Sequence, residues 1–352
     1  MAIEFYSTDT DQGTISVIRK DDHGYQVVKQ IKVGNAPRGS VKFTKAGRGF
    51  VSNTSGCTVS ELDPFNHREV QRITVGMGPR GIGIIPGDRY MLVSNSGSDT
   101  MSLVDLSISK EVLQLPVGRD PRHLGITKDG NWAYVCIWGD SYISKLDLSS
   151  LKENVVEGVK EVARIELPEN SNPYSLNIDP SGRFALVACN ATDHVPVIAL
   201  DSDTVQYRVD VDCDDGLCGA RAVAFSSDGQ FAFVTLERTN AVAVISLETF
   251  SIQRYIQAGS APRGIIQDND MIVISNFSRV LMGAVAVNSV KLIPHSITFV
   301  NLKGIDIASK VAMPASSYSQ TRVGNGPCSI SMFDPATVLL GNRSNLQMTV
   351  EA

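Results

Sequence analysis

A short turn motif that recurs along the chain constrains its fold more than any other feature. Three of the intervals, from Pro37 to Pro79, from Pro79 to Pro121 and from Ala220 to Pro262, are each 42 residues, and the others are longer. A fixed period with occasional insertions predicts a repeat architecture. The seven copies are Asn35-Ala36-Pro37-Arg38-Gly39, Gly78-Pro79-Arg80-Gly81, Asp120-Pro121-Arg122-His123, Asn172-Pro173-Tyr174-Ser175, Gly219-Ala220-Arg221-Ala222, Ala261-Pro262-Arg263-Gly264 and Gly326-Pro327-Cys328-Ser329.

Each period contains the same series of strand and turn signals. After the turn motif comes a short apolar segment such as Ile82–Ile85, and then a hairpin turn such as Pro86-Gly87-Asp88. A second apolar segment ends in Ser-Asn, and a third, such as residues 100–105, alternates between apolar and polar residues. A fourth leads to the next turn motif. Period-two alternation and glycine-containing turns predict four antiparallel strands per repeat.

Repeats of four strands and about 40–45 residues are typical of propeller blades. The motif string resembles the YVTN-type propeller repeat, with a Val-Gly-x-x-Pro turn, a Pro-Asp-Gly-like hairpin and a strand that ends in Ser-Asn. This superfamily includes seven-bladed lactonases, surface-layer proteins and the propeller subunits of some amine dehydrogenases. The resemblance covers nearly the whole chain and implies one all-β domain over residues 1–352, a seven-bladed β-propeller of four-stranded antiparallel blades.

The two ends of the chain are expected to close the ring together. Glu4–Thr8, Thr14–Ile18 and Tyr25–Val28 align with second, third and fourth strands, so the first blade lacks its innermost strand. Ser329–Phe333 would supply it, which leaves no open sheet edge. Residues 338–342 and 346–350 also resemble second and third strands, and an incomplete eighth blade is the alternative. We favour seven blades, because a blade without an inner strand would leave a gap at the axis.

The composition argues against several classes of function. A net charge of −5 gives no general attraction to nucleic acid or anionic lipid. We read no secretory signal and no membrane helix, and expect a cytoplasmic protein without a membrane or nucleic-acid partner. The five histidines include no pair with the spacing of metal ligands, and no phosphate-binding loop or haem motif is present. We therefore expect no metal and no cofactor.

The six cysteines are scattered along the chain. Cys136 and Cys189 lie inside apolar strand patterns and read as buried packing residues. Cys213 and Cys218 are close enough in sequence for a disulfide, but a cytosolic protein usually keeps such thiols reduced. We favour two loop thiols.

The turn motifs place arginines at one end of the propeller axis. In a propeller the turn that leads into the first strand lies on the same face as the turn after the second strand. Five guanidinium groups would therefore surround an axial mouth, with Tyr174 and Cys328 at the two remaining positions. Trp138 and Glu237, like the asparagines of the Ser-Asn endings, should lie around them. The candidate ligand-binding residues are Arg38, Arg80, Arg122, Arg221, Arg263, Trp138, Asn53, Asn95 and Asn276.

Two interpretations of the arginines remain open. A guanidinium is a planar fork that suits carboxylate and phosphate, so the mouth would bind an anionic small molecule. Alternatively, each arginine bonds carbonyls and carboxylates of a neighbouring blade, as a structural residue of a repeat does.

Departures from the repeat are the candidates for catalysis. His123 replaces glycine beside Arg122, Tyr174 replaces arginine, and Glu237 replaces the Ser-Asn ending in the blade of Arg221. A histidine with a pKa near 6.5 or a glutamate can transfer protons, and arginines can stabilise an oxyanion. Pro121-Arg122-His123 resembles a Pro-Arg-His turn of the phosphogluconolactonase type. The resemblance implies a hydrolase, or a lyase or cyclase, that acts on a carboxylate or lactone; a structural histidine is the alternative.

Three insertions interrupt the period, at about residues 151–161, 210–217 and 277–295. The first is charged and is expected at the outer edge, and the second is acidic. The third contains the apolar run Val280–Val287 and is expected to act as a lid, as a surface for a protein partner, or as an extra hairpin packed on its blade. A protein-interaction scaffold is therefore a further candidate function, and fold alone does not choose among these functions.

Overall fold

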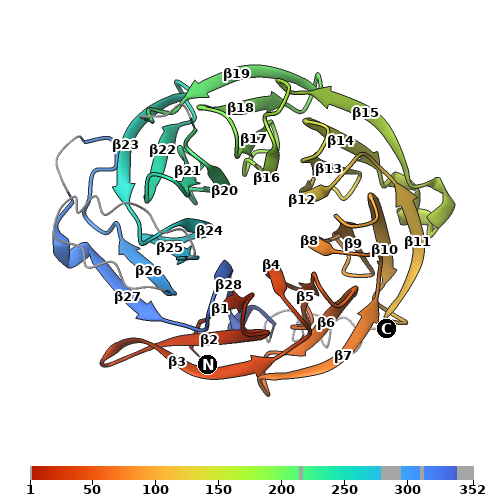
Figure 1. Cartoon of the computed structure of the whole chain (residues 1–352), viewed down its shortest axis with the longest axis horizontal. Helices are drawn as coiled ribbons and strands as arrows, with labels where there is room; N and C mark the ends of the chain where they lie inside the picture. The colour runs from red at the N-terminus through yellow and green to blue at the C-terminus, as the bar shows by residue number, and fades with distance from the viewer. Residues whose placement is uncertain (1, 214–216, 279–294, 310–312, 339–352) are drawn as a thin grey trace, which may run out of the picture.

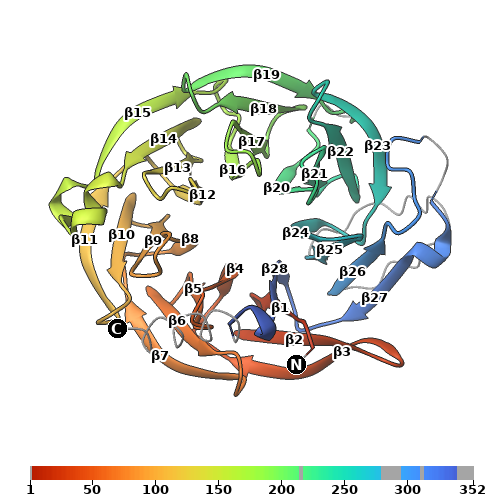
Figure 2. The same cartoon turned by 180° about the vertical axis from the view of Figure 1, so that it is seen from behind.

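The computed structural model describes residues 2–213, 217–278, 295–309 and 313–338. These residues form seven four-stranded antiparallel sheets, arranged as the blades of a ring (Figure 1), which is seen from the opposite face in Figure 2. The prediction of an all-β, seven-bladed propeller is confirmed.

Each blade contributes one strand to each of four positions, from the axis outwards. The innermost strands are β4 (Pro37–Phe43), β8 (Pro79–Ile84), β12 (Pro121–Ile126), β16 (Pro173–Ile178), β20 (Ala220–Phe225), β24 (Pro262–Asp268) and β28 (Pro327–Phe333). The second strands are β1 (Glu4–Asp9), β5 (Gly49–Asn53), β9 (Tyr90–Asn95), β13 (Trp132–Ile137), β17 (Phe184–Cys189), β21 (Phe231–Leu236) and β25 (Met271–Asn276). The third strands are β2 (Thr14–Asp21), β6 (Thr58–Asp63), β10 (Thr100–Asp105), β14 (Tyr142–Asp147), β18 (His194–Ala199), β22 (Ala241–Ser246) and β26 (Ser296–Asn301). The outermost strands are β3 (Gly24–Lys32), β7 (Arg68–Thr74), β11 (Lys110–Pro116), β15 (Lys160–Glu166), β19 (Thr204–Asp210), β23 (Ser251–Gln257) and β27 (Tyr318–Arg322).

The turn motif has the same backbone conformation in all seven blades. The residue before each innermost strand lies in the left-handed region, with φ between 50° and 71°. Only three of these residues are glycines, so the other four blades accept a conformation that costs a residue with a Cβ some free energy. The seven are Ala36, Gly78, Asp120, Asn172, Gly219, Ala261 and Gly326. The shared turn fixes where the next two side chains point.

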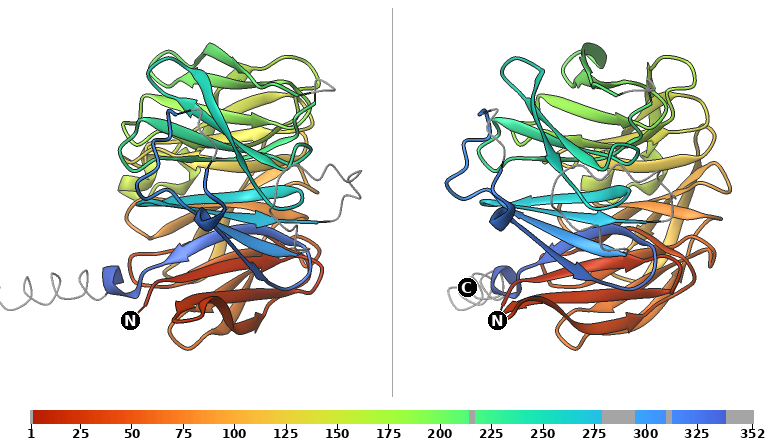
Figure 3. Two further views of the ribbon diagram at one scale, coloured as in Figure 1. Left: turned by 90° about the vertical axis from the view of Figure 1, so that its left-hand side faces the viewer. Right: turned by 60° about the vertical axis from the view of Figure 1, so that its left-hand side comes forward.

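The two ends of the described chain meet in one blade. β28 pairs antiparallel with β1, with Tyr6 opposite Ser331 and Glu4 opposite Phe333. Figure 3 shows the first strands (red) and the last described strands (blue) packed side by side. The predicted closure is confirmed. The alternative of an incomplete eighth blade from residues 338–342 and 346–350 lies, apart from Val338, outside the described residues.

Hydroxyl groups on the second strands link neighbouring blades close to the axis. Thr235 Oγ1 accepts from the Ala222 N–H and donates to the Arg263 carbonyl of the next blade, both at 3.0 Å. Ser94 Oγ accepts from the Gly81 N–H at 2.8 Å and donates to the Arg122 carbonyl. The backbone carbonyl groups of these two arginines thus accept hydrogen bonds that join neighbouring blades. Their side chains take no part in these bonds.

The insertion at 151–161 contains short 3-10 helices at the outer edge, η1 (Ser149–Glu153) and η2 (Val156–Gly158). Leu151 and Val159 are buried between blades, so the segment also fills a seam. A third, η3 (Ala315–Ser317), precedes β27. Among the described residues no helix is long and apolar enough to cross a membrane.

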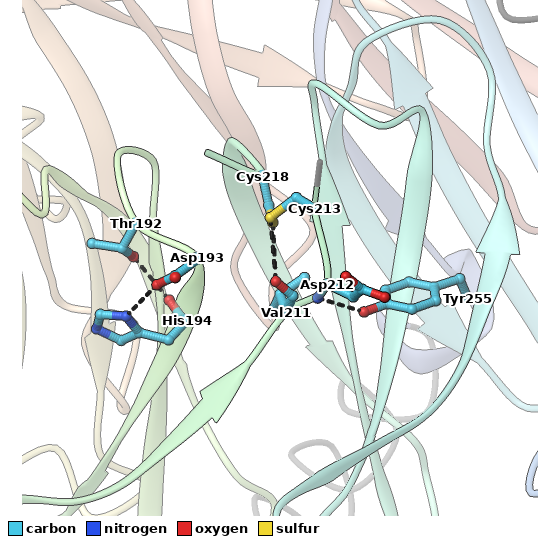
Figure 4. The surroundings of a disulfide bond; sticks show 8 residues. All are labelled: Thr192, Asp193, His194, Val211, Asp212, Cys213, Cys218 and Tyr255. Carbon is cyan, nitrogen blue, oxygen red and sulfur yellow. Dashed lines mark hydrogen bonds and ion pairs between the residues drawn. A yellow bond between two sulfur atoms is a disulfide. The ribbon is translucent and has the colours of Figure 1, made fainter. Parts of the chain in front are cut away.

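The insertion at 210–217 corrects one expectation. Cys213 and Cys218 form a disulfide with a Cα–Cα distance of 5.6 Å, whereas we favoured free thiols. Figure 4 shows the bond beside Val211, and the neighbouring Asp212 N–H donates to the Tyr255 hydroxyl at 2.9 Å. Reducing compartments usually break such bonds, so the disulfide does not favour a cytoplasmic location, and that location stays a prediction.

Candidate functional site

Seven side chains from seven blades surround one end of the axis. Each is the second residue of an innermost strand, directly after the proline or alanine that follows the left-handed turn. They are Arg38, Arg80, Arg122, Tyr174, Arg221, Arg263 and Cys328. The innermost strands lie closest to the centre in Figure 1, and we call these seven side chains the mouth ring.

One side of the ring contains its own counter-charge. Glu237 accepts from both Arg221 and Arg263, with 2.6 Å between its Oε1 and the Nη2 of Arg263. The carboxylate is 6% exposed and both guanidinium groups are below a fifth exposed. A buried carboxylate with two guanidinium partners is a structural cluster, since it uses both oxygens. Glu237, a predicted proton-transfer group, therefore has a clear role in joining two blades.

Arg122 has a carboxylate partner within the protein, although its Nε is buried without a hydrogen-bond partner among the described residues. It pairs with Asp120, two residues earlier in the same turn, and its guanidinium lies 4.8 Å from the ring centre of Trp138. Tyr174 lies between Arg122 and Arg221, at 5.5 and 4.4 Å from the two guanidinium groups. Such contacts stabilise a cation against an aromatic face. Trp138 and Tyr174 hold arginines in place, and Tyr174 is only 6% exposed.

Arg38 and Arg80 differ from the other three arginines. Neither forms an ion pair with a carboxylate in the part of the chain that the structure describes. The Nε and Nη1 atoms of Arg80 and the Nε of Arg38 are buried without a hydrogen-bond partner among the described residues. Burial, together with the charges of Arg122 and Arg38, lowers the pKa of Arg80 to about 10. This side of the mouth ring carries uncompensated positive charge.

His123 lies one residue further along its strand and faces the same channel. Burial, followed by the charges of Lys42 and Arg80, lowers its pKa to about 3. At neutral pH the ring is therefore uncharged, and the expected pKa near 6.5 is wrong for the free protein. The ring centre lies 5.5 Å from that of Tyr174. A neutral imidazole can still donate or accept a hydrogen bond from a ligand.

The asparagines of the Ser-Asn endings do not reach the mouth. Asn53, Asn95 and Asn276 are fully buried. The Nδ2 of Asn53 donates to Thr58 and Ser60 on the third strand of its own blade, at 3.1 and 2.7 Å. These three side chains have no exposed surface and their amides donate within their own blades, so they leave the candidate ligand-binding set. A Cβ on Gly34 would lie 2.5 Å from Asn53, which explains the glycine of the Val-Gly turn.

The register of the second strand also needs a correction. Trp138 and Glu237 do not replace the asparagine of the repeat but the residue after it. In every blade the N–H of that residue donates to the carbonyl of the left-handed turn residue, and we call this place the mouth position. It is occupied by Thr10, Thr54, Ser96, Trp138, Asn190, Glu237 and Phe277.

Sequence reasoning missed three residues that shape the site. Lys42, four residues after Arg38, lines the axial channel and lowers the pKa of His123. Asp120 neutralises Arg122, and the ring of Phe277 lies 3.5 Å from the Arg263 guanidinium. The signal for both was available: Asp120 stands where five of the other six turns carry glycine or alanine, and Phe277 stands where three of the other six blades carry a hydroxyl residue.

A channel of about 180 Å³ extends from the mouth ring along the innermost strands. Its walls include Lys42, His123, Tyr174, Arg221, Arg263 and Cys328. Among the described residues no group of three or more His, Cys, Asp or Glu could hold a metal ion. The site therefore offers cationic and neutral hydrogen-bond donors around a small volume.

Comparison with known proteins supports the fold and gives one family match. Residues 117–271, fewer than half of the chain, match the family model "Lactonase, 7-bladed beta-propeller". No curated protein matches the sequence.

Solved structures of the same shape are distant in sequence. A putative 6-phosphogluconolactonase from Bacteroides fragilis is 12% identical, with a TM-score of 0.75, and the alignment covers 95% of this chain and 98% of that one. The periplasmic gluconolactonase of Pseudomonas aeruginosa is 14% identical, with a TM-score of 0.73 and coverage of 95% and 99%. Hydrazine synthase of Kuenenia stuttgartiensis is 17% identical, with a TM-score of 0.69, and the alignment covers 87% of this chain and 98% of that one. At these identities the likeness shows the propeller fold alone.

Proposed function

We propose that the mouth ring binds a small molecule through an anionic group, with Arg38 and Arg80 as its donors. The observation that carries this proposal is the pair of buried Arg80 nitrogens, Nε and Nη1, without a partner. A buried donor that lacks a partner costs free energy, and a charged one costs more. A carboxylate or phosphate bound beside Arg80 would accept from its guanidinium nitrogens, because oxyanions are the partners that guanidinium groups favour.

The opposite side of the ring gives the ligand its position. Glu237 already neutralises Arg221 and Arg263, so the positive field is strongest on the side of Arg38 and Arg80. An anionic group would bind there, and the rest of the molecule would extend towards His123 and Lys42 in the channel.

Calorimetric titration with inorganic phosphate and with citrate tests the proposal. We expect binding that weakens as salt is raised, and at least tenfold weaker binding in Arg80→Met. Arg72→Met is the matched control, because Arg72 is exposed on an outermost strand and pairs with Glu69 at 2.8 Å. Equal affinity in the wild type and in Arg80→Met would rule out the proposed site.

The family match favours a second candidate function, hydrolysis of a lactone. The matched residues 117–271 include most of the distinctive side chains of the mouth, from Arg122 and His123 to Glu237 and Arg263. A cyclic ester that carries an anionic group would place its carbonyl near neutral His123, which can donate a hydrogen bond to the developing oxyanion. Glu237 would keep Arg221 and Arg263 in place, and Tyr174 would orient Arg122 and Arg221.

Acid release from glucono-δ-lactone and from its 6-phosphate, followed at constant pH, tests this candidate. We expect faster turnover of the phosphorylated compound, and a loss of that preference in Arg80→Met. His123→Asn should lower kcat more than it raises KM. If neither compound is hydrolysed above the rate in buffer while phosphate still binds, the mouth is a binding site and not a lactonase site.

A protein-interaction role for the insertion at 277–295 stays a prediction, because residues 279–294, with the run Val280–Val287, lie outside the described residues.

A further inference from the structure

Cys328 occupies an unusual position for a cysteine. It is the only non-arginine, non-aromatic member of the mouth ring, and its strand β28 lies between β24, which carries Arg263, and β4, which carries Arg38. The residue is 7% exposed, and that exposure lies in the wall of the axial channel. On its other side it packs against Ala261 and Phe277.

We propose that Cys328 is a nucleophilic thiolate that reacts selectively with small electrophiles carrying an anionic group. The inference rests on the proposed function, because the arginines that would hold the anion also surround the sulfur. No carboxylate pairs with Arg38 or Arg80 among the described residues. Their positive charge can therefore act on the anionic group of the electrophile and on the sulfur of Cys328. The two partnerless nitrogens of Arg80, which carry the proposed function, support an anion beside Cys328 as well.

The electrostatics of the mouth favour the reactive form of the thiol. Burial acts to raise the pKa of Cys328, but the charges of Arg263, Arg38, Arg80 and Arg221 together lower it from its usual value. At two other buried cysteines burial is the main influence: it raises the pKa of Cys189 to about 12, and it also raises that of Cys136. The thiolate is the nucleophilic form of cysteine, and a positive environment favours it.

The reaction needs no co-reactant. The thiolate attacks the electrophilic carbon, a carbon–sulfur bond forms, and the leaving group departs with the bonding electrons. The carboxylate of the same molecule would lie against Arg38 and Arg80, which places the carbon beside the sulfur. Iodoacetate has this chemistry, and iodoacetamide is its neutral counterpart of nearly equal size, in which iodide leaves in the same way.

Competitive alkylation with these two reagents tests the inference on the intact protein, with each cysteine followed by peptide mass spectrometry. We expect iodoacetate to label Cys328 at least tenfold faster than iodoacetamide, and phosphate or high salt to remove the preference. Cys57, which is partly exposed and outside the mouth, is the internal control and should show no preference for the anion. Arg80→Met should abolish the preference at Cys328, whereas Arg72→Met should keep it.

The outcomes separate this inference from the proposed function. If phosphate binds but neither reagent labels Cys328 at pH 7, the cysteine is a packing residue and the inference is wrong while the binding proposal stands. If iodoacetamide labels Cys328 as fast as iodoacetate, the arginines do not select the electrophile and the inference is again wrong. If Cys328 prefers iodoacetate and Arg80→Met removes that preference, both proposals are supported.

Discussion

The two sides of the mouth ring use the same repeat in different ways. Around Arg38 and Arg80 the mouth positions carry hydroxyl residues, and each hydroxyl donates to the next blade: Thr10 to Pro37 at 2.8 Å, and Thr54 to Pro79 at 2.8 Å. Around Arg221 and Arg263 the mouth position carries Glu237, which pairs with both arginines. A small hydroxyl joins blade to blade and leaves the guanidinium groups unpaired, whereas a carboxylate joins blade to blade by neutralising them.

This difference teaches that repetition alone does not decide the role of a repeated residue. The structural interpretation applies to one side of the ring, and the anion-binding proposal concerns the other. Arg221 and Arg263 are structural residues, as the second interpretation expected, while Arg38 and Arg80 are the arginines on which the anion-binding proposal rests.

The largest expected effect is on the neutralised side. Glu237→Gln leaves Arg221 and Arg263 close together without a counter-charge, so we expect the free energy of unfolding to fall by about 3 kcal/mol. Urea unfolding measures this change. Adding Arg263→Met to the same chain should restore part of the loss; an unchanged midpoint for Glu237→Gln would show that the cluster contributes nothing.

The second largest effect on stability is expected at Asp9, a buried carboxylate in the blade that β28 and β1 close. Asp9 stands where Asn53, Asn95 and Asn276 stand in other blades, it is fully buried, and burial raises its pKa to about 7 from 3.8. Because the unfolded chain loses its proton more readily, ionisation of Asp9 destabilises the fold as pH rises from about 4, with the full cost above pH 7. Asp9→Asn should therefore stabilise the protein by about 2 kcal/mol at pH 8.

Thermal unfolding at pH 8 and pH 4 checks this prediction. The gain in Asp9→Asn should shrink at pH 4, where the native carboxyl is protonated. Equal gains at both pH values would mean that the charge of Asp9 is not the cause.

On the unpaired side we expect the opposite pattern from that of Glu237→Gln. Arg80→Met removes a buried cation without a carboxylate partner, so the free energy of unfolding should stay the same or rise by up to about 1 kcal/mol, while phosphate binding weakens. Urea unfolding with and without phosphate measures both effects. A loss of stability like that of Glu237→Gln would remove the difference between the two sides.

The titration of His123 reports on the same side. In the free protein its ring should stay neutral from pH 8 to pH 5, because its pKa is about 3. A bound anion offsets the charges of Lys42 and Arg80, so the pKa should rise when phosphate is added. NMR of the imidazole signals measures this, with His123→Asn to assign them. Identical titrations with and without phosphate would place the anion elsewhere.

The smallest effect on stability is expected for the hydrogen bonds that hydroxyl groups at the mouth positions donate to the next blade. Thr54→Val removes the hydrogen bond to Pro79 and should cost about 1 kcal/mol. Its binding of phosphate should be unchanged, since the arginines remain.

The sequence allowed the fold to be predicted nearly in full, because the period, the turns and the strand alternation are local signals that agree. The placement of the five arginines followed from the same logic. The pairing of Arg122 with Asp120 and of Glu237 with two arginines did not, because ion pairs depend on side-chain directions that a repeat count does not give. An error of one residue in register also placed Asn53 at the mouth and grouped Glu237 with the asparagines.

The pKa of His123 was missed for a related reason. A histidine in a turn reads as accessible, but the turn lies inside a ring of cations, and only the three-dimensional arrangement shows that Lys42 and Arg80 act on it.

The pairing of β28 with β1 has a consequence for biosynthesis. A growing chain on the ribosome contains six of the seven innermost strands before Cys328 is translated. The pairing of β28 with β1, which closes the ring of blades, cannot form until then. The mouth ring is therefore complete only once Cys328 has been added. A shortened product that stops before Pro327 would leave β1 as an unpaired strand edge, open to association with other chains, and would lack one member of the mouth ring.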